Sequence, residues 1–135
     1  MISSCIFCQI IRGQREAFIV YETENVVAFL DKYPVYEGHT LIVPKEHYRD
    51  IFETPDVILG EMISVAKKLS IALRVSLKAS GVRIVMNNGR SAGQEIMHVH
   101  IHVIPYGVNY TGRRELTLEE GEKVSKMIKD ALQQV

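Results

Sequence analysis

Polar and apolar residues alternate strictly along residues 98–103, and this is the clearest pattern in the chain. His98, His100 and His102 fall at every second position, with valine or isoleucine between them. A period of two is that of a β-strand with one buried face. The pattern therefore predicts a strand, closed by Pro105, that presents three of the five histidines on one face.

Shorter apolar runs and stripes at helical spacing predict the other elements of secondary structure. The expected strands are residues 18–21, 26–30, 39–44, 82–87 and 98–104. The expected helices are residues 5–11, 54–77 and 117–132. The resulting fold class is α+β: an antiparallel sheet of about five strands, with the long helix packed on one face and a further helix at the C-terminus.

Polar residues mark the expected start of each helix. The serines at positions 3–4 are expected to cap the first helix. The Thr54 hydroxyl, followed by Pro55, is expected to cap the second. Thr117 and Glu120 have the spacing of a capping box, which predicts the start of the last helix.

Composition is that of an ordinary soluble globular protein, with 47% hydrophobic and 24% charged residues. A length of 135 residues predicts a single domain over residues 1–135. Sixteen basic and sixteen acidic residues cancel, which argues against broad electrostatic binding of nucleic acid or an anionic membrane. No apolar run has the length of a membrane span, and the N-terminus lacks the features of a signal peptide. We therefore expect a cytoplasmic protein.

The two cysteines, Cys5 and Cys8, lie three positions apart in the expected first helix, so both thiols share one helical face. In a reducing compartment such a pair is typical of a metal site or a redox site. A thioredoxin-like redox pair expects a preceding strand, and none is predicted here. We favour a metal site, in which two thiolates supply half of the tetrahedral ligand set of zinc.

The histidine row allows two kinds of chemistry. An H-x-H pair on a strand can bind a catalytic zinc, whereas a single imidazole can attack phosphorus while its neighbours hold the phosphate oxygens. The five histidines and two cysteines exceed the ligands of one zinc, which favours two separate tasks. Asn87, Gln94 and His39, with the small and polar loop over residues 88–95, suit a phosphate better than a second metal. That loop also fits a mobile connection between strands.

The ordered motifs resemble those of the histidine triad (HIT) family. Residues 98–104 match its defining pattern, in which three histidines alternate with apolar residues. The other matching segments, in the same order, are Cys5-Ile6-Phe7-Cys8, Ala28-Phe29-Leu30-Asp31, residues 38–45, and Asn87-Asn88-Gly89 with Gly93-Gln94. The similarity spans about residues 5–105 and is greatest to the branch of small nucleotide-binding hydrolases. It implies a HIT-like α+β fold.

The resemblance implies catalytic roles for three histidines. His100 would attack the α-phosphorus of a nucleotide and form a nucleotidyl-histidine. A neutral imidazole suits that role, because a free pKa of about 6.5 leaves it largely unprotonated at pH 7. His102 and His39 would contact phosphate oxygens.

The same resemblance implies the residues that bind substrate. Asp31 stands at the family position that binds ribose hydroxyls, and a carboxylate can accept two O–H bonds. Asn87 and Gln94 would place the phosphate or the leaving group. The remaining expected contacts are Gly93 in the polar loop and, against the base, Phe7 and Ile10. Glu95 stands where many relatives have serine or threonine, and its carboxylate would repel phosphate unless it is protonated or accepts a hydrogen bond from a leaving amine.

Relatives with the N-terminal cysteine pair resemble zinc proteins that add two histidine ligands. The corresponding ligands here are Cys5, Cys8, His47 and His98, a closed Cys2His2 set of the structural type. Zinc would then pin the first helix to the sheet and leave His100 and His102 for chemistry.

The implied function is hydrolysis or transfer of a nucleoside monophosphate joined to a leaving group, which is an amine in a phosphoramidate, a sulfate, or a second nucleotide linked through polyphosphate. The expected partner is a purine nucleotide. One alternative is a dedicated dinucleoside polyphosphate hydrolase, and another is a zinc-stapled module that binds purine nucleotides without turnover. The family pairs two such units, and a homodimer fits the expected strand over residues 82–87 together with apolar residues outside the main stripe of the long helix, Ile63 and Ile71 among them.

Overall fold

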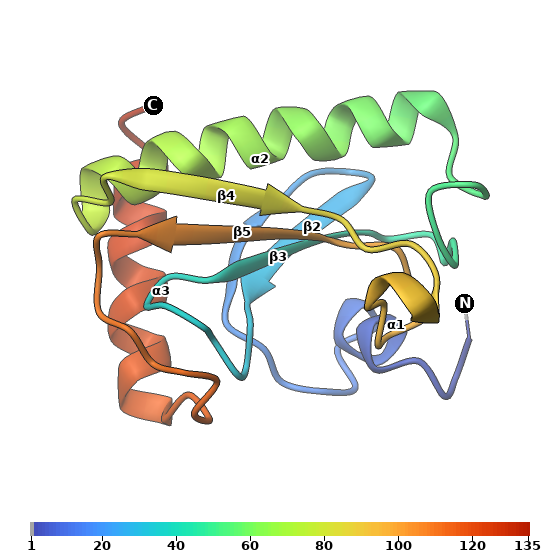
Figure 1. Ribbon diagram of the computed structural model, residues 1–135, viewed down its shortest axis with the longest axis horizontal. Helices are drawn as coiled ribbons and strands as arrows, with labels where there is room; N and C mark the ends of the chain where they lie inside the picture. Colours follow the sequence, from blue (N-terminus) through green and yellow to red (C-terminus); the bar gives the residue numbers. More distant parts are fainter. Residues whose placement is uncertain (1) are drawn as a thin grey trace.

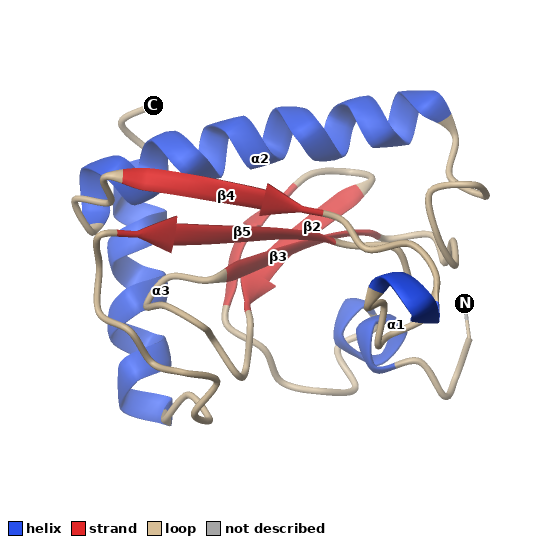
Figure 2. Cartoon of the chain, viewed as in Figure 1, coloured by secondary structure: helices blue, strands red, loops and turns tan. Residues whose placement is uncertain are grey.

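The computed structural model describes residues 2–135, and within this range five strands form one sheet. Their order is β1-β2-β3-β5-β4, and each neighbouring pair is antiparallel. The strands are β1 (Ile19–Glu22), β2 (Val26–Leu30), β3 (Thr40–Pro44), β4 (Gly81–Val85) and β5 (Ile101–Tyr106). The helices are α1 (Ile6–Ile11), α2 (Asp56–Ser76) and α3 (Leu118–Leu132), with a short 3-10 turn, η1, over Arg90–Ala92. The predicted α+β class and antiparallel sheet are confirmed (Figure 2).

Helices cover both faces of the central strands. The long helix α2 lies along one face, and α3 packs against α2 and β1 (Figure 1). The larger apolar core fills this side, with Ala28 and Ile42 of the sheet beneath Leu69 of α2. On the opposite face, Phe7 of α1 packs on Phe29. Every position of β2 and β3 is buried as a result, which explains why both strands appear in the sequence as unbroken apolar runs.

The N-cap of α1 is Cys5, so the predicted cap by the serines at positions 3–4 is wrong. The Cys5 Sγ atom accepts the backbone N–H of Cys8 at 3.4 Å. A sulfur atom therefore takes the place that a serine hydroxyl usually fills. The side chain that caps the start of the helix is also one of the predicted metal ligands.

The other two predicted caps have different outcomes. The Thr54 hydroxyl donates to the carbonyl oxygen of Asp50 at 2.7 Å and does not cap α2, so that prediction is wrong. The capping box of Thr117 and Glu120 at the start of α3 is confirmed. Among residues 2–135 no helix is both long and apolar enough to cross a membrane.

The histidine segment is only partly a strand, which corrects both of its predicted ends. β5 begins at Ile101, because the N–H of Val99 donates to the carbonyl oxygen of Tyr48, beyond the end of β3, at 2.7 Å. At its other end β5 continues through Pro105. The pairing of β3 with β5 ends at Val103, two residues before Pro105. The missing N–H of Pro105 therefore removes no hydrogen bond between these two strands.

The edge strand β4 ends at Val85, two residues earlier than predicted. Asn87 therefore belongs to the connection that leads into η1. The predicted loop over residues 88–95 is confirmed, and η1 makes one tight turn within it. Gly93 ends that turn in the left-handed conformation, with φ of 93°, which glycine adopts without steric cost.

Candidate functional site

Residues 98–102 pass between two groups of polar side chains. The cysteine–histidine cluster consists of Cys5, Cys8, His47 and His98. The histidine–aspartate cluster consists of Asp31, His39 and His102. Within each cluster, the potential ligand atoms all lie within 4.8 Å of one another. The structure thus brings together the residues that the sequence assigned to metal and, separately, two of the three assigned to catalysis.

The cysteine–histidine cluster joins α1 to the segment that follows β3. The Sγ atom of Cys8 lies 3.3 Å from Nδ1 of His47 and 3.6 Å from Nδ1 of His98. The Sγ atom of Cys5 lies 3.4 Å from the same Nδ1 of His98. Nε2 of His98 lies 2.8 Å from the carbonyl oxygen of Pro44, which only accepts, so Nε2 carries the proton. The lone pair on Nδ1 is then free beside the thiols.

This donor set fits zinc. Two cysteines and two histidines form a common tetrahedral set for a structural zinc ion, and a backbone carbonyl fixes the tautomer of one histidine as in known zinc sites. Burial lowers the pKa of His98 to about 4 and also lowers that of His47, which keeps both imidazoles neutral as metal binding requires. Burial raises the pKa of the Cys5 thiol, so the thiolate needs a cation beside it.

In the histidine–aspartate cluster, backbone contacts decide where the protons lie. The N–H of Val35 donates to Nδ1 of His39 at 3.1 Å, so a neutral His39 carries its proton on Nε2. That Nε2 lies 3.0 Å from Nδ1 of His102 and 3.5 Å from Oδ2 of Asp31. When His39 donates to His102, the second imidazole must hold its own proton on Nε2. One backbone bond thereby fixes the tautomers of two catalytic candidates.

The same proton makes the histidine–aspartate cluster a poor metal site. A cation on Nε2 of His39 would have to displace the proton that the Val35 contact places there. Burial lowers the pKa of His39 to about 3 and that of His102 to about 4, so both rings are neutral at physiological pH. The two clusters are therefore suited to different tasks, one to metal binding and the other to donating hydrogen bonds.

His100 lies between the two clusters along the chain and is buried. Its Nδ1 atom lies 2.7 Å from the carbonyl oxygen of His98 and must donate to it. The lone pair of the ring is therefore on Nε2. The Phe7 ring packs edge-on against it with centroids 5.1 Å apart, and the centroid of His102 is 4.9 Å away. Burial lowers the pKa of His100, which favours the neutral and nucleophilic form of this imidazole.

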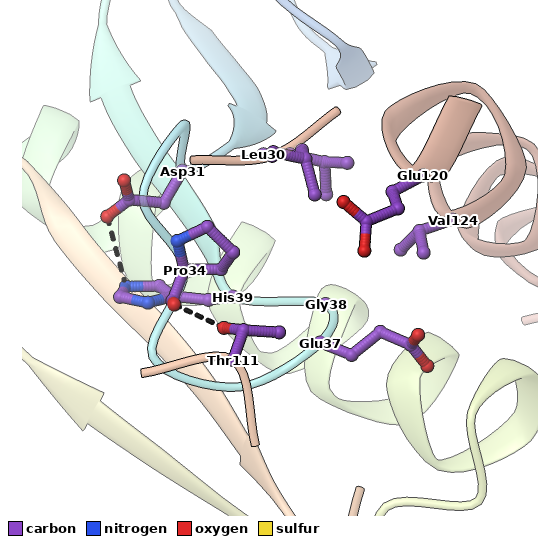
Figure 3. A pocket seen from close by; sticks show the side chains of 10 residues that line it. Leu30, Asp31, Pro34, Glu37, Gly38, His39, Thr111, Glu120 and Val124 are labelled. Atoms are coloured by element: carbon purple, nitrogen blue, oxygen red, sulfur yellow. Dashed lines mark hydrogen bonds and ion pairs between the residues drawn. The ribbon is translucent and has the colours of Figure 1, made fainter. Parts of the chain in front are cut away.

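Asp31 follows β2 and is directed toward His39 (Figure 3). Its Oδ1 atom accepts the N–H of Tyr33 at 2.9 Å, and burial raises the pKa of its carboxyl group. A cavity of about 20 Å³ lies beside it, which is enough for one water molecule. The lining residues are Leu30, Asp31, Pro34, Glu37, Gly38, His39, Thr111, Leu116, Glu120 and Val124.

The polar loop before the histidines is held in place by Gln94, a residue that is only 3% exposed. The side-chain oxygen of Gln94 accepts the N–H of Gly89 at 2.8 Å. Its amide nitrogen donates to the carbonyl oxygens of Arg49 at 2.6 Å and Ile96 at 3.0 Å. These contacts satisfy the amide within the protein. A direct contact of Gln94 with phosphate stays a prediction, and one that requires some of these bonds to break.

Of the other predicted contact residues, Gly93 and Glu95 belong to this loop and Asn87 directly precedes it. A Cβ atom on Gly93 would lie 3.7 Å from Nδ2 of Asn87, so these two residues are adjacent. Glu95 is exposed, and its charge acts on both His100 and Asp31.

The residues expected against the base come from α1. Phe7 and Ile10 belong to the smaller apolar core, together with Phe29 and Leu41 of the sheet. Phe7 also meets the ring of His98 at 5.8 Å between centroids. The same aromatic side chain thus contacts a member of the cysteine–histidine cluster and the candidate nucleophile. Movement of α1 would therefore affect the predicted base pocket and His100 together.

The sequence analysis missed the segment over residues 107–116, which shows no period. This segment, which we call the strap, follows the loop from Asp31 to His39 through backbone bonds from Thr111 to Val35 and from Arg113 to Pro34. Arg113 of the strap lies close to Asp31, with its Nη1 atom 3.8 Å from Oδ2. Without periodicity or a motif, the sequence carries no signal that would place this segment beside the histidines.

Comparisons with known proteins agree with this arrangement. The family model described as "HIT domain" matches residues 12–107. The solved structure of a hypothetical histidine triad nucleotide-binding protein from Sulfolobus tokodaii is similar with a TM-score of 0.92 and 39% identity, covering 96% of this chain and 93% of that one. A zinc-bound histidine triad family protein from Mycobacterium smegmatis has a TM-score of 0.88 and 36% identity, with coverage of 97% and 94%. Adenosine 5′-monophosphoramidase of Candida albicans is 40% identical over 82% of this chain and 75% of that protein.

Proposed function

The chain belongs to the HIT family, and from that premise we propose that it cleaves a nucleoside monophosphate from its leaving group through a nucleotidyl-histidine intermediate. One observation carries the proposal. The contact between Nδ1 of His100 and the carbonyl oxygen of His98 leaves Nε2 as the nitrogen with a free lone pair. A buried neutral imidazole of this kind is a nucleophile toward phosphorus.

The proposed reaction has two steps. Nε2 of His100 attacks the α-phosphorus, and an N–P bond forms while the bond to the leaving group breaks. The leaving group departs with the electron pair, accepts a hydrogen bond from the N–H at Nε2 of His102, and takes its proton from solvent water. Water then attacks the phosphorus, the N–P bond breaks, and the proton that this water loses returns to solvent. The nucleoside monophosphate is released and Nε2 of His100 regains its lone pair.

The substrate-binding roles in this proposal follow the predicted residues. Asp31 accepts the ribose hydroxyls, and the base lies against Phe7 and Ile10. A purine phosphoramidate is supported by the name of the Candida albicans relative. Sulfate and polyphosphate-linked nucleotide remain candidate leaving groups, and a dedicated dinucleoside polyphosphate hydrolase is the alternative enzyme.

Adenosine 5′-phosphoramidate and diadenosine tetraphosphate, incubated side by side with the protein, test the function. We expect AMP release from at least one of them. His100→Ala should reduce turnover by at least about a thousandfold, while affinity for AMP and the melting temperature change little, because the nucleophile acts mainly in the transition state. Absence of AMP release from both substrates would instead support a module that binds nucleotides without turnover.

We further propose that the cysteine–histidine cluster holds zinc in a structural role. Its four ligands would close the coordination sphere and leave no position for substrate. Bound zinc would fix α1, and with it Phe7 and Ile10 of the base pocket. Both cysteines are free, and zinc thiolates fit the reducing cytoplasm that we expect for this protein.

A homodimer is also proposed, formed through the free edge of β4 and the outer face of α2. Ile84 on β4 is 46% exposed, and Ile63 and Ile71 are exposed on one side of α2. Pairing two β4 edges would cover an unpaired strand and these apolar side chains. Light scattering should give the mass of a dimer at micromolar concentration. Ile84→Lys should reduce it to that of a monomer, whereas Phe52→Lys, at an exposed apolar residue outside β4 and α2, should not.

A further inference from the structure

The strap holds an arginine in an uncommon backbone conformation beside the histidine–aspartate cluster. Arg113 has φ of 68°, in the left-handed region that residues with a Cβ atom rarely adopt. The only other non-glycine residue with positive φ within residues 2–135 is Lys78, which follows the end of α2. Arg113 does not follow a helix. It lies with Gly112 at the centre of a tight turn, which the N–H of Arg114 closes by donating to the carbonyl oxygen of Thr111 at 3.2 Å.

Three consecutive backbone donors of the strap, on residues 111–113, hold Arg113 in this place. The N–H groups of Thr111 and Gly112 both donate to the carbonyl oxygen of Val35, at 2.9 and 3.0 Å. The N–H of Arg113 donates to the carbonyl oxygen of Pro34 at 2.8 Å. Val35 is also the residue whose own N–H fixes the tautomer of His39. The strap and the loop from Asp31 to His39 therefore form one hydrogen-bonded unit.

The guanidinium of Arg113 is directed toward this site but lacks a close partner. Its Nη1 atom lies 3.8 Å from Oδ2 of Asp31 and 3.4 Å from the carbonyl oxygen of Tyr33, and the side chain is 55% exposed. These are long contacts for a group with five N–H donors. Neighbouring Arg114 differs, because it pairs with both carboxylate oxygens of Glu120 at 2.8 and 2.9 Å.

The positive charge of Arg113 affects the pKa values of all three residues of the histidine–aspartate cluster. It lowers the pKa of His39 and of His102, in each case after the larger effect of burial. It also opposes the effect of burial on the pKa of Asp31. The neutral histidines proposed to hold the reacting phosphate are thus flanked by a cation whose donors are largely free.

We infer that Arg113 binds a second phosphate group of the substrate, in addition to the phosphate that His100 attacks. An arginine fork can donate two parallel hydrogen bonds to phosphate, which a neutral leaving group cannot accept in the same way. The second phosphate lies either in a polyphosphate chain beyond the α-phosphate or on the ribose that Asp31 holds. This inference rests on the proposed function and adds a preference for doubly phosphorylated nucleotides.

Equilibrium binding of three nucleotides to the whole protein tests the inference. AMP carries one phosphate, ADP carries a second in the chain, and adenosine 3′,5′-bisphosphate carries a second on the ribose. We expect ADP or the bisphosphate to bind about tenfold more tightly than AMP at low salt, and the ligand that gains identifies the position. Arg113→Gln should reduce this advantage to about twofold or less. Arg114→Gln is the matched control and should preserve it.

Two different failures can be told apart. If AMP binds but neither second phosphate improves affinity, or if the advantage survives Arg113→Gln, the role of Arg113 is wrong while the proposed function stands. An equal loss in Arg114→Gln would also overturn it, because it would show a general charge effect. If the wild-type protein neither binds nor hydrolyses any nucleotide, the proposed function fails first and the inference fails with it.

Discussion

At the scale of single residues, buried imidazoles connect the stability of the protein to pH. Burial lowers the pKa of His39 to about 3 and that of His102 to about 4. The unfolded chain, with histidine pKa values of about 6.5, therefore binds more protons than the folded protein between about pH 6.5 and pH 4. The free energy of unfolding should fall as pH falls through this window, by up to about 1.4 kcal/mol per pH unit for each of the two residues.

Urea denaturation between pH 8 and pH 4 measures this dependence. His39→Asn removes one of these buried imidazoles and should make the slope shallower in the same window. A free energy of unfolding that stays constant or rises on acidification from pH 6.5 would contradict the neutral, buried state of these histidines.

The residues of the site were predictable, but their proton positions were not. The spacing of His98, His100 and His102 identified them as a functional group in the sequence. Their tautomers depend on backbone atoms of Val35, Pro44 and His98, whose positions no side-chain pattern records. A sequence pattern records which side chains are present, whereas the direction of a hydrogen bond depends on how distant segments meet.

At the scale of elements, α3 packs closely on Phe18, the residue before β1, and this contact determines the effect of substituting Gly121. Gly121 lies within α3, where alanine would ordinarily stabilise the helix. A Cβ atom there would overlap the ring of Phe18, so Gly121→Ala should destabilise the protein by about 1–3 kcal/mol. Gly60 of α2 has no atom within 4 Å of the corresponding position, and Gly60→Ala should stabilise by up to about 1 kcal/mol. Thermal unfolding compares the two, and a loss of stability in both or in neither would contradict this packing.

Element types were predictable because apolar periodicity follows burial, whereas their ends depended on contacts from elsewhere. The alternation around the histidines continues to His98, yet the ladder of β5 begins at Ile101 because Tyr48 takes the N–H of Val99. Thr54 has the right type for a cap, but its hydroxyl bonds to Asp50. A backbone N–H or a side-chain hydroxyl can bond to several nearby groups, and the tertiary structure determines which of them it contacts.

At the scale of the whole molecule, the cysteine–histidine cluster connects the N-terminal helix to the rest of the fold. Purified protein should contain one zinc per chain by elemental analysis. Replacing Cys5 and Cys8 together by serine should lower the melting temperature by at least about 5 °C, because a structural metal contributes folding free energy. Ser3→Ala with Ser4→Ala is the control and should have little effect, since neither serine caps α1.

The activity of the same double variant separates structure from catalysis. Loosening α1 should raise the Michaelis constant through the base pocket, while kcat falls far less than in His100→Ala. Absence of zinc together with two freely titratable thiols would contradict the metal site. Turnover lost as completely as in His100→Ala would place the metal in the reaction itself.

The strap over residues 107–116 is the part of the site that the sequence does not predict, because its position depends on how distant segments of the chain meet. The strap over residues 107–116 has no periodicity, and its alignment beside the loop from Asp31 to His39 rests on backbone bonds that any residue except proline can make. The sheet, its covering helices and the two histidine groups follow from patterns of side chains. The position of Arg113 follows from backbone contacts alone, so only the folded structure reveals it.

The central claim is that His100 forms a covalent bond to phosphorus, and the stereochemistry of hydrolysis tests it most directly. A substrate with a chiral α-phosphorothioate is hydrolysed in isotopically labelled water, and the configuration at phosphorus is determined in the released nucleoside phosphorothioate. Two successive in-line displacements, the first by Nε2 of His100 and the second by water, retain the configuration, and retention is the predicted result. Inversion would show a single attack by water and would contradict the nucleotidyl-histidine intermediate.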